Sequence, residues 1–323
     1  MSGSIPNFAA LLAPVGPETF LEQYWESQPL HVHRPDHDFY EALLTRREVD
    51  LAISSGGLRY PAIQLAKDGG FLPPEVFTRT IRSGNDLFTG IPILDRVHTE
   101  YRSGATISLP GFHRAWKPLG ALAAAIEDDF GHPVHTNVYI TPGNSTGFSP
   151  HYDTHEVFVL QIAGSKHWRI HEPPLKLPHR GHPFDPRSQT STAPHFEVDL
   201  NPGDLLYLPR GFVHTTTTAE SFSVHVTLGI TVYTWVELLT DWAQSSKNHP
   251  ALRRALPPGF VGNESVKRSL KDQLPRIIAE LQRVTDYDRL LDDFSHRVRS
   301  ARTGAQPDFQ SDVTAGEPPT ARK

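Results

Sequence analysis

The chain has 323 residues, of which 38% are hydrophobic and 21% are charged, and its net charge is −5. This length allows one large hydrophobic core or two modest ones. No uninterrupted apolar run reaches the roughly 18 residues that cross a bilayer, and no basic region precedes the short apolar run near the N-terminus. The charges are spread along the chain without a basic stripe. We therefore expect a globular, cytoplasmic protein that binds neither membranes nor nucleic acid.

The chain contains no cysteine but 18 histidines. Without cysteine there is no disulfide framework, no thiolate nucleophile and no Cys-ligated zinc or iron–sulfur site. A metal must therefore be bound by histidine, aspartate or glutamate. So many imidazoles direct the search to metal or acid–base chemistry.

Residues 1–133 are expected to form a helical and mixed N-terminal part of the catalytic domain. Apolar residues at helical spacing follow Phe8, and residues 29–33 look extended. Gly-Gly and Pro-Pro pairs over residues 52–104 predict an irregular connection with short helices. Helical spacing returns over residues 118–130, and a Gly-His-Pro sequence ends that helix.

Residues 134–233 change to short runs of strand length that are separated by turn residues. The predicted strands are Val138–Ile140, Val157–Ile162, His167–Ile170, Leu205–Leu208, Val213–Thr217 and Ser223–Ile230. Several short strands at this spacing predict an antiparallel barrel or jelly roll as the catalytic core. The Pro-rich segment 173–194 is predicted to be a long loop, a kind of segment that often forms a functional lid.

Residues 234–300 return to helical spacing, with three apolar stripes. Asn263 is the expected N-cap of the second helix, which Pro275 is expected to kink or split. On sequence alone, the stripes fit packing onto the barrel at least as well as an oligomer interface. Residues 301–323 lose most apolar side chains and are expected to be a disordered tail.

The most informative motif begins at His151. Residues two apart on a strand project from one face, so His151 and Asp153 can bind one metal ion together. His214 ends a Gly-Asp, Pro-x-Gly-x-x-His sequence that starts at Gly203, and this is the turn–strand–turn–strand order of cupin-type barrels. It supplies the third ligand. Two imidazoles and one carboxylate on one side of a metal form the facial triad of non-haem Fe(II) oxygenases.

A His-x-Asp pair alone is common by chance. The complete second half of the motif makes a core His214 and a turn Asp153 the less favoured interpretation. His155, on the same strand face as Asp153, and Glu156 are rival ligands that we do not favour.

Five segments carry a resemblance to a known family: NVYITP from Asn137, PHYDTHEVFVLQ from Pro150, GSKHWR from Gly164, PGDLLYLPRGFVH from Pro202 and SVHVT from Ser223. In these segments the chain resembles the JmjC-type cupin oxygenases, in the group of ribosomal oxygenases that hydroxylate histidine or arginine in ribosomal proteins. Weaker similarity covers nearly everything except the predicted tail. The resemblance implies a mainly β fold, a double-stranded β-helix with N-terminal and C-terminal helices.

The resemblance also implies Fe(II), O2 and the cosubstrate 2-oxoglutarate. It gives Lys166 the role of the cation that pairs with the far carboxylate of 2-oxoglutarate, with Arg169 as the alternative. It matches Asn137 and Tyr139 to residues that hydrogen-bond the same cosubstrate. A solvated hairpin lysine is the structural alternative for Lys166.

The resemblance therefore implies a 2-oxoglutarate- and Fe(II)-dependent dioxygenase that hydroxylates an amino-acid side chain in a protein or peptide. Its substrate is open between a ribosomal protein, a peptide natural product, and a free amino acid or small metabolite, with histone-lysine demethylation ranked lower. Two further alternatives are a non-catalytic metal-binding interaction module and a zinc or manganese cupin. The complete triad and the intact Lys166 argue against both.

The family plan comprises a barrel, a helical dimerisation region and a winged helix. Residues 235–301 are too few for the last two, so we expect a homodimer formed through the C-terminal helices and a missing or rudimentary winged helix.

Two other groups of polar residues are expected to have simpler roles. Ser223, His225 and Thr227 alternate onto one strand face and are expected to line the pocket. Several histidines outside the centre are expected in loops or on the surface, without a second metal: His31, His33, His132, His135, His179 and His182.

Overall fold

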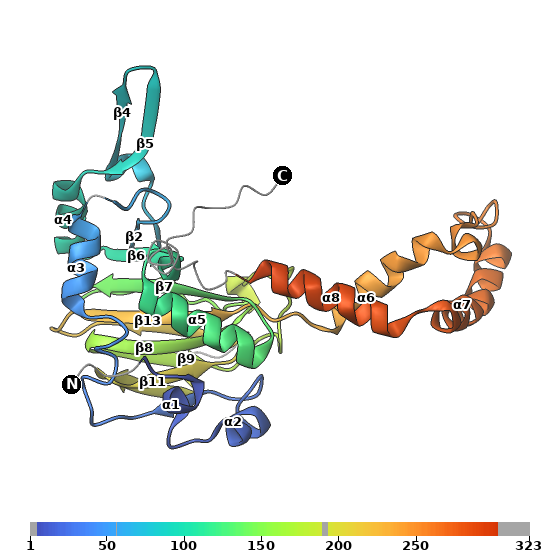
Figure 1. Ribbon diagram of the computed structural model, residues 1–323, viewed down its shortest axis with the longest axis horizontal. Helices are drawn as coiled ribbons and strands as arrows, with labels where there is room; N and C mark the ends of the chain where they lie inside the picture. The colour runs from blue at the N-terminus through green and yellow to red at the C-terminus, as the bar shows by residue number, and fades with distance from the viewer. Residues whose placement is uncertain (1–4, 56, 189–192, 303–323) are drawn as a thin grey trace, which may run out of the picture. The chain divides into compact units, whose positions relative to one another are not determined.

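The computed structural model describes residues 5–55, 57–188 and 193–302 (Figure 1). The chain divides into two compact units, one that ends at Thr231 and one that runs from Val232 to Arg302. The expected disordered tail lies outside the described residues except for its first two positions. Within the described residues, no helix is both long enough and apolar enough to cross a membrane.

The first unit begins with four short elements, of which the strand β1 joins the large sheet: α1 (Phe8–Leu12), α2 (Pro17–Gln23), β1 (Leu30–Val32) and α3 (Arg46–Ser54). Helix α1 buries the apolar face that its spacing predicts. Helix α3 starts at a capping box, because the Glu48 amide donates to the Thr45 hydroxyl at 3.2 Å and the Thr45 amide donates to the Glu48 carboxylate at 2.7 Å.

The prediction of an irregular connection with short helices over residues 52–104 is only partly correct, because short helices are present but strands take the place of most of the irregular structure. This segment contains β2 (Gln64–Lys67), β3 (Gly70–Phe71), β4 (Thr78–Ser83), β5 (Asp86–Pro92) and α4 (Leu94–Arg102). Strands β4 and β5 form a separate hairpin whose turn includes Gly84 at φ +61°, and Figure 1 shows it extending from the rest of the unit. Most side chains of this hairpin are exposed, so it lacks the apolar alternation by which a half-buried strand is recognised.

The central strands form a jelly roll, which confirms the predicted fold class. Strand β6 (Thr106–Pro110) and helix α5 (Lys117–Phe130) precede β7 (Val134–Thr141), β8 (Glu156–Gly164), β9 (Lys166–His171), β10 (Phe196–Leu200), β11 (Leu205–Leu208), β12 (Val213–Thr217) and β13 (Ser223–Ile230). One antiparallel sheet has the order β1-β11-β8-β13-β7-β6-β2-β3, and a smaller one has the order β10-β9-β12. Strand β10 was not predicted, although its sequence Phe-Glu-Val-Asp-Leu alternates between apolar and acidic residues as a half-buried strand does.

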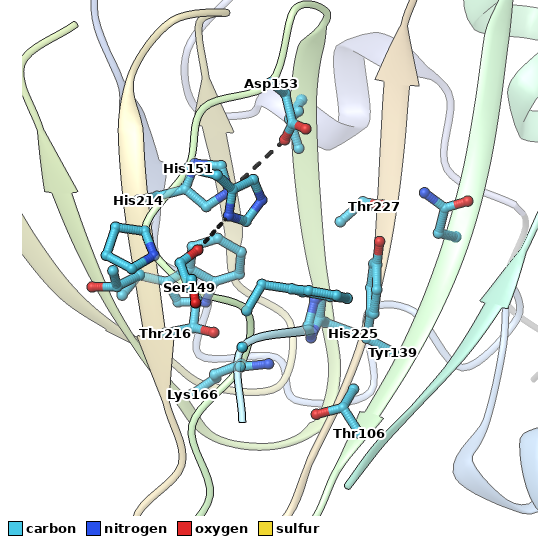
Figure 2. A pocket seen from close by; sticks show the side chains of 18 of the residues that line it. Thr106, Tyr139, Ser149, His151, Asp153, Lys166, His214, Thr216, His225 and Thr227 are labelled. Atoms are coloured by element: carbon cyan, nitrogen blue, oxygen red, sulfur yellow. Dashed lines mark hydrogen bonds and ion pairs between the residues drawn. The ribbon is translucent and has the colours of Figure 1, made fainter. Parts of the chain in front are cut away.

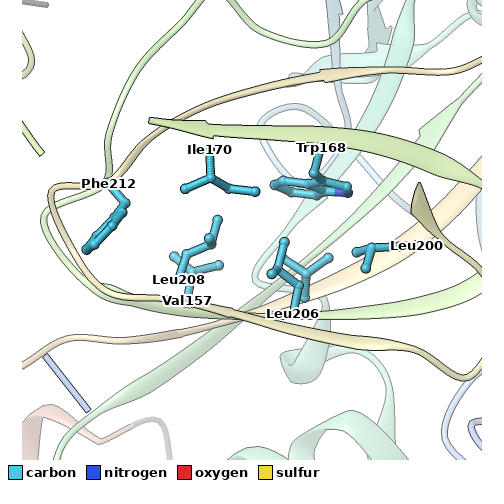
Figure 3. Packing of buried hydrophobic residues seen from close by; sticks show 8 residues of the cluster. Val157, Trp168, Ile170, Leu200, Leu206, Leu208 and Phe212 are labelled. Atoms are coloured by element: carbon cyan, nitrogen blue, oxygen red, sulfur yellow. The ribbon is translucent and has the colours of Figure 1, made fainter. Parts of the chain in front are cut away.

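The core lies between these two sheets (Figure 3). Strands β8 and β11 contribute one side, and β9 and β10 contribute the other. The buried members are Val157, Val159, Trp168, Ile170, Leu200, Leu206, Leu208 and Phe212. Burying an aliphatic or aromatic side chain of this size stabilises the fold by about 1.5–3 kcal/mol. This packing holds β9, which carries Lys166, and the turn that leads into β12, the strand of His214.

The second unit contains α6 (Trp235–Ser245), α7 (Glu264–Val284) and α8 (Tyr287–Ala301). Asn263 caps α7 as predicted, because its side-chain oxygen accepts the Ser265 amide at 2.9 Å. Pro275 lies inside α7 without splitting it. The Trp242 indole donates to the Thr285 hydroxyl at 2.6 Å and so ties α6 to the C-terminal end of α7.

Shorter 3₁₀ turns lie at Pro74–Val76, Phe112–Arg114, Pro186–Ser188, Ser246–Asn248 and Pro250–Arg253.

Candidate metal centre

His151, Asp153 and His214 offer ligand atoms that all lie within 4.8 Å of one another (Figure 2). His214 is on β12, whereas His151 forms an isolated bridge opposite it and Asp153 lies in the loop before β8. The sequence places the first two on a continuous strand, and the structure replaces this strand with a bridge and a loop. The His214 amide donates to the His151 carbonyl at 2.9 Å, and the Gly211 amide donates to the Asp153 carbonyl at 3.0 Å. Backbone contacts therefore fix all three side chains around one point.

Both imidazoles are held in an orientation that suits metal binding. Nδ1 of His151 lies 2.8 Å from the carbonyl oxygen of Ser149, and Nδ1 of His214 lies 3.1 Å from that of Phe212. A carbonyl oxygen can only accept, so each Nδ1 carries the proton and each Nε2 keeps a free lone pair. Nε2 of His214 lies 3.8 Å from a carboxylate oxygen of Asp153, a gap that one ion with bonds of about 2.1 Å can bridge.

The protonation states also suit a metal. Burial, followed by the neighbouring His151, lowers the pKa of His214 to about 4, so its imidazole is neutral at pH 7. Burial acts to raise the pKa of Asp153, but the imidazoles of His155, His214 and His151 together outweigh it and hold that pKa below its usual range. Metal ligands need these two states, a neutral imidazole and an ionised carboxylate.

A cavity of about 390 Å³ opens beside the three side chains. This volume lies within the range of small-molecule binding sites. All the residues that the sequence singles out for metal and cosubstrate binding line it: Asn137, Tyr139, His151, Asp153, Lys166 and His214.

Lys166 brings a buried positive group into this cavity. Its side chain is only 4% exposed, and burial lowers its pKa to about 7. Nζ donates to the Thr141 hydroxyl at 3.0 Å, and that hydroxyl lies 3.1 Å from the Thr106 hydroxyl. Among the described residues, no carboxylate pairs with Lys166. This excludes a solvated hairpin lysine and leaves a buried amine that an anionic ligand would satisfy.

Arg169, the alternative cation, points away from the cavity. Its side chain is 54% exposed and lies 3.5 Å from the carboxylate of Glu197 on the neighbouring strand β10. The alternation of β9 explains the difference, because Lys166 and Arg169 are three residues apart and therefore face opposite sides.

Tyr139 and Asn137 project into the cavity from β7, opposite His225 and Thr227 of β13. The Tyr139 ring stacks on the His225 ring at 5.1 Å. Burial, with a smaller contribution from Asp153, raises the pKa of Tyr139 to about 12, so its hydroxyl stays protonated and can donate a hydrogen bond. Nδ1 of His225 is buried without a hydrogen-bond partner.

The predicted polar face of β13 is only partly correct. His225 and Thr227 line the cavity, whereas the prediction for Ser223 is wrong. Its hydroxyl accepts a hydrogen bond from the Gln161 side chain at 3.0 Å and is fully buried.

The two rival ligands lie elsewhere. The His155 ring lines the cavity but packs against the His135 ring at 4.7 Å. Glu156 is fully buried and accepts from the Tyr207 hydroxyl at 2.5 Å and from the Arg210 guanidinium at 2.7 Å. Neither belongs to the ligand cluster.

The described residues of the Pro-rich segment 173–194 do not line the cavity. They pack instead on Tyr152, whose hydroxyl donates to the His182 carbonyl at 3.0 Å and whose ring contacts Phe184 at 5.2 Å. These contacts anchor the loop beside the metal-binding segment, and a lid over the cavity is not seen in its described part.

Sequence reasoning missed an aromatic edge of the cavity. Phe71 and Phe148 line it, with their rings 5.1 Å apart. Gly69 brings them together through a bridge to Phe148 at φ +86°, and a Cβ there would lie 2.1 Å from the Ser149 hydroxyl. The Gly-Gly pair that indicated only a loop is therefore a place where two backbones approach closely.

A family model and the curated relatives indicate the same family for this chain. Residues 116–238 match the JmjC domain family. The chain is 29% identical over 312 residues to the bifunctional lysine-specific demethylase and histidyl-hydroxylase NO66 of Aedes aegypti. This alignment covers 88% of this chain and 46% of that protein. It is 30% identical over 271 residues to ribosomal oxygenase 2 of Mus musculus, which covers 79% of this chain and 55% of that protein. The chain thus spans about half the length of these curated relatives.

Among solved structures, the ribosomal oxygenase YcfD of Escherichia coli aligns with a TM-score of 0.49 and 16% identity, over 82% of this chain and 67% of that one.

Proposed function

We propose that this chain, a JmjC-domain protein of the ribosomal-oxygenase-like group, is an Fe(II)- and 2-oxoglutarate-dependent dioxygenase that hydroxylates an amino-acid side chain of a protein. One observation carries the proposal. A cluster of two histidines and one carboxylate shares a cavity with a buried lysine that has no carboxylate partner among the described residues. A metal-bound water needs no such distant cation, whereas the far carboxylate of 2-oxoglutarate does.

The residues present fit the metal and the cosubstrate. His151 and His214 would bind Fe(II) through Nε2, together with the carboxylate of Asp153, and three further positions remain for 2-oxoglutarate and O2. The chemistry supplied by bound Fe(II) is the O2-dependent decarboxylation of 2-oxoglutarate to succinate and CO2, coupled to hydroxylation of a substrate C–H bond.

The chain's own groups bind and orient. Lys166 would hold the far carboxylate of 2-oxoglutarate by an ion pair, and the Tyr139 hydroxyl, which also lines the cavity, would donate a hydrogen bond to the cosubstrate from the β7 side. The two carbonyls that hold the histidine Nδ1 protons keep both rings from turning. Phe148 and the other apolar walls of the cavity exclude water from the reacting centre.

An anaerobic titration of the apo-protein with Fe(II) and then 2-oxoglutarate tests the site without knowledge of the substrate. We expect a saturable visible charge-transfer band from bidentate chelation, absent in His214→Ala and Asp153→Ala. His98→Ala, which removes an exposed histidine on α4, serves as the matched control and should keep the band. A wild-type protein that binds Fe(II) but gives no band would refute the cosubstrate assignment.

The substrate class rests on the relatives. They are named as a bifunctional lysine-specific demethylase and histidyl-hydroxylase and as a ribosomal oxygenase, which supports a protein side chain, with a histidine of a ribosomal protein as the first candidate. Incubation with purified ribosomal subunits should add one oxygen atom to a single tryptic peptide, measured by mass spectrometry, in the wild type and not in His214→Ala. If 2-oxoglutarate turnover is stimulated by free amino acids but by no protein, the substrate is instead a free amino acid or small metabolite.

We also propose that α6 to α8 form the interface of a homodimer. The described helices of this unit leave large apolar side chains exposed, among them Trp235 at 77% and Leu274 at 58%. Exposed apolar surface on this scale is typical of an interface, and a second copy of the unit offers the same surface. Light scattering should give a dimer for the wild type and a monomer for Leu274→Glu, while Asp272→Lys on the opposite face of the same helix should stay dimeric. A monomeric wild type would refute the proposal.

A further inference from the structure

A second group of metal-binding side chains lies outside the cavity. Nε2 of His31 is 3.5 Å from one carboxylate oxygen of Asp204, and Nδ1 of His33 is 3.0 Å from the other. Ligand atoms of the three residues lie within 4.8 Å of one another, and none of the three lines the cavity. We propose that His31, His33 and Asp204 form a second site, for a divalent transition metal of the Zn²⁺ type. This replaces the expectation that these histidines have no metal.

Strand pairing explains how the three residues meet. Strand β1 pairs antiparallel with β11, so that Val32 lies opposite Leu205, the residue directly after Asp204. His31 and His33 are two apart and therefore project from the same side of β1. Gly203 allows this close approach, because it adopts φ +92° and a Cβ there would lie 2.3 Å from the carbonyl oxygen of Asp36.

The Asp204 carboxylate has acceptor capacity left on the side of the histidines. It is fully buried, and each oxygen accepts one backbone amide at 2.9 Å, from Arg34 and from Asn201. An ionised carboxylate offers about four lone-pair sites, so one site on each oxygen faces the histidines, and the one on Oδ1 lies within hydrogen-bond distance of Nδ1 of His33, at 3.0 Å. The Arg34 guanidinium forms no ion pair with the Asp204 carboxylate. It donates instead to the carbonyl oxygen of Gly203 and to that of Ala10 in α1. Asp204 is therefore a buried anion that forms no ion pair with lysine or arginine among the described residues.

The histidines complete a metal site. Nε2 of His31 is buried and has no hydrogen-bond partner, although it lies beside the carboxylate. The His33 side chain is 64% exposed, so an ion can enter there and water can fill a fourth position. Two imidazoles and one carboxylate with an open fourth position match the ligand set of Zn²⁺ sites that have three protein ligands and one bound water. A bound dication would also neutralise the buried carboxylate. The competing state is a hydrogen bond from Nδ1 of His33 to Asp204, so metal binding requires the imidazole proton of His33 to be on Nε2, which leaves the Nδ1 lone pair free.

The test uses full-length apo-protein in which the candidate iron centre has been removed by His151→Ala and His214→Ala. This background separates the second site from the proposed function. Calorimetric titration with Zn²⁺ should show one remaining site, and adding His33→Ala should weaken it by about tenfold or more, because a ligand is lost. His37→Ala, at an exposed histidine four residues after His33 and outside the cluster, is the matched control and should leave the titration unchanged.

Thermal unfolding gives a second readout. A metal that binds the folded state raises Tm, so Zn²⁺ should raise Tm of the background variant and not of the variant that also carries His33→Ala. Because His33 is exposed, its replacement should not prevent folding. No Zn²⁺ binding in the background variant, or binding that His33→Ala leaves unchanged, would overturn the proposal and leave the hydrogen bond between His33 and Asp204 as the role of the cluster.

Discussion

Oε1 of Glu156 lies 2.7 Å from Nη1 of Arg210, and both side chains are buried. Glu156 follows Asp153 by three residues, and Arg210 precedes His214 by four, so the pair joins the two segments that carry the candidate ligands. The Arg210 amide also donates to Glu156, at 3.3 Å. An ion pair that links both sides of a metal centre should position its ligands as well as stabilise the fold.

Replacing Glu156 by alanine should destabilise the protein strongly, because Arg210 would stay buried with only its contact to Glu26. Breaking a buried pair costs up to about 3–5 kcal/mol, and the remaining carboxylate reduces that cost. Urea unfolding measures the loss. Glu197→Ala, at an exposed carboxylate, should cost no more than about 1 kcal/mol.

The milder variant Glu156→Gln tests positioning separately from stability. It keeps the size of the side chain and weakens only the charge interaction, so Fe(II) affinity should fall while the protein remains folded at 20 °C. Unchanged Fe(II) affinity in a measurably destabilised Glu156→Gln would limit the pair to a structural role.

Lys166→Met should stabilise the apo-protein and abolish high-affinity binding of 2-oxoglutarate. The substitution fits the same buried volume but removes an amine that has only a hydroxyl partner. We expect a higher Tm without cosubstrate and a 2-oxoglutarate requirement raised by about 100-fold, as follows from losing a buried ion pair worth about 3 kcal/mol. Arg169→Met is the control, and an equal effect there would reassign the cation.

The binding of 2-oxoglutarate should weaken as pH rises above about 7. Burial lowers the pKa of Lys166 to about 7, and only the ammonium form pairs with a carboxylate. Below this pH the amine is charged before the cosubstrate arrives, whereas above it binding must first take up a proton. Dissociation constants measured from pH 6 to 9 should therefore rise in the wild type and stay flat in Lys166→Met.

The same pKa sets the sign of a stability effect. Between pH 7 and the unfolded-state pKa of about 10.4, the unfolded chain binds more protons at Lys166 than the folded chain does, so this residue makes stability rise with pH. The stabilisation by Lys166→Met should be largest below pH 7 and should shrink at higher pH. A difference that grows with pH would contradict a buried, weakly partnered amine.

Gly229→Ala should disturb the wall of the cavity at His155. A Cβ at this position of β13 would lie 2.3 Å from the His135 ring and 2.7 Å from the His155 ring. The overpacking should cost about 1–3 kcal/mol in urea unfolding and displace His155 from the cavity. Gly70→Ala, where a Cβ meets nothing within 4 Å, should cost much less.

The features that could be predicted from the sequence depend on the local spacing of apolar residues and on turn-forming residues. Strands β11, β12 and β13 have the predicted bounds, because each alternates or runs apolar between strong turn signals. The His151–Asp153 pair and the motif from Gly203 to His214 came from residue types at short spacings. Lys166 came from the family resemblance, and the chemical roles of all four residues remain predictions. The exposed β4–β5 hairpin escaped notice because local apolar period reveals a strand only where one face is buried.

Tertiary structure decided which distant residues share one place. His33 and Asp204 are 171 residues apart and meet only because β1 pairs with β11. Phe71 reaches the cavity because Gly69 pairs with Phe148, and Ser223 is turned to Gln161 and not to the cavity. No local pattern encodes such meetings, because strand order and the packing of one sheet on the other arise from burial summed over the whole unit.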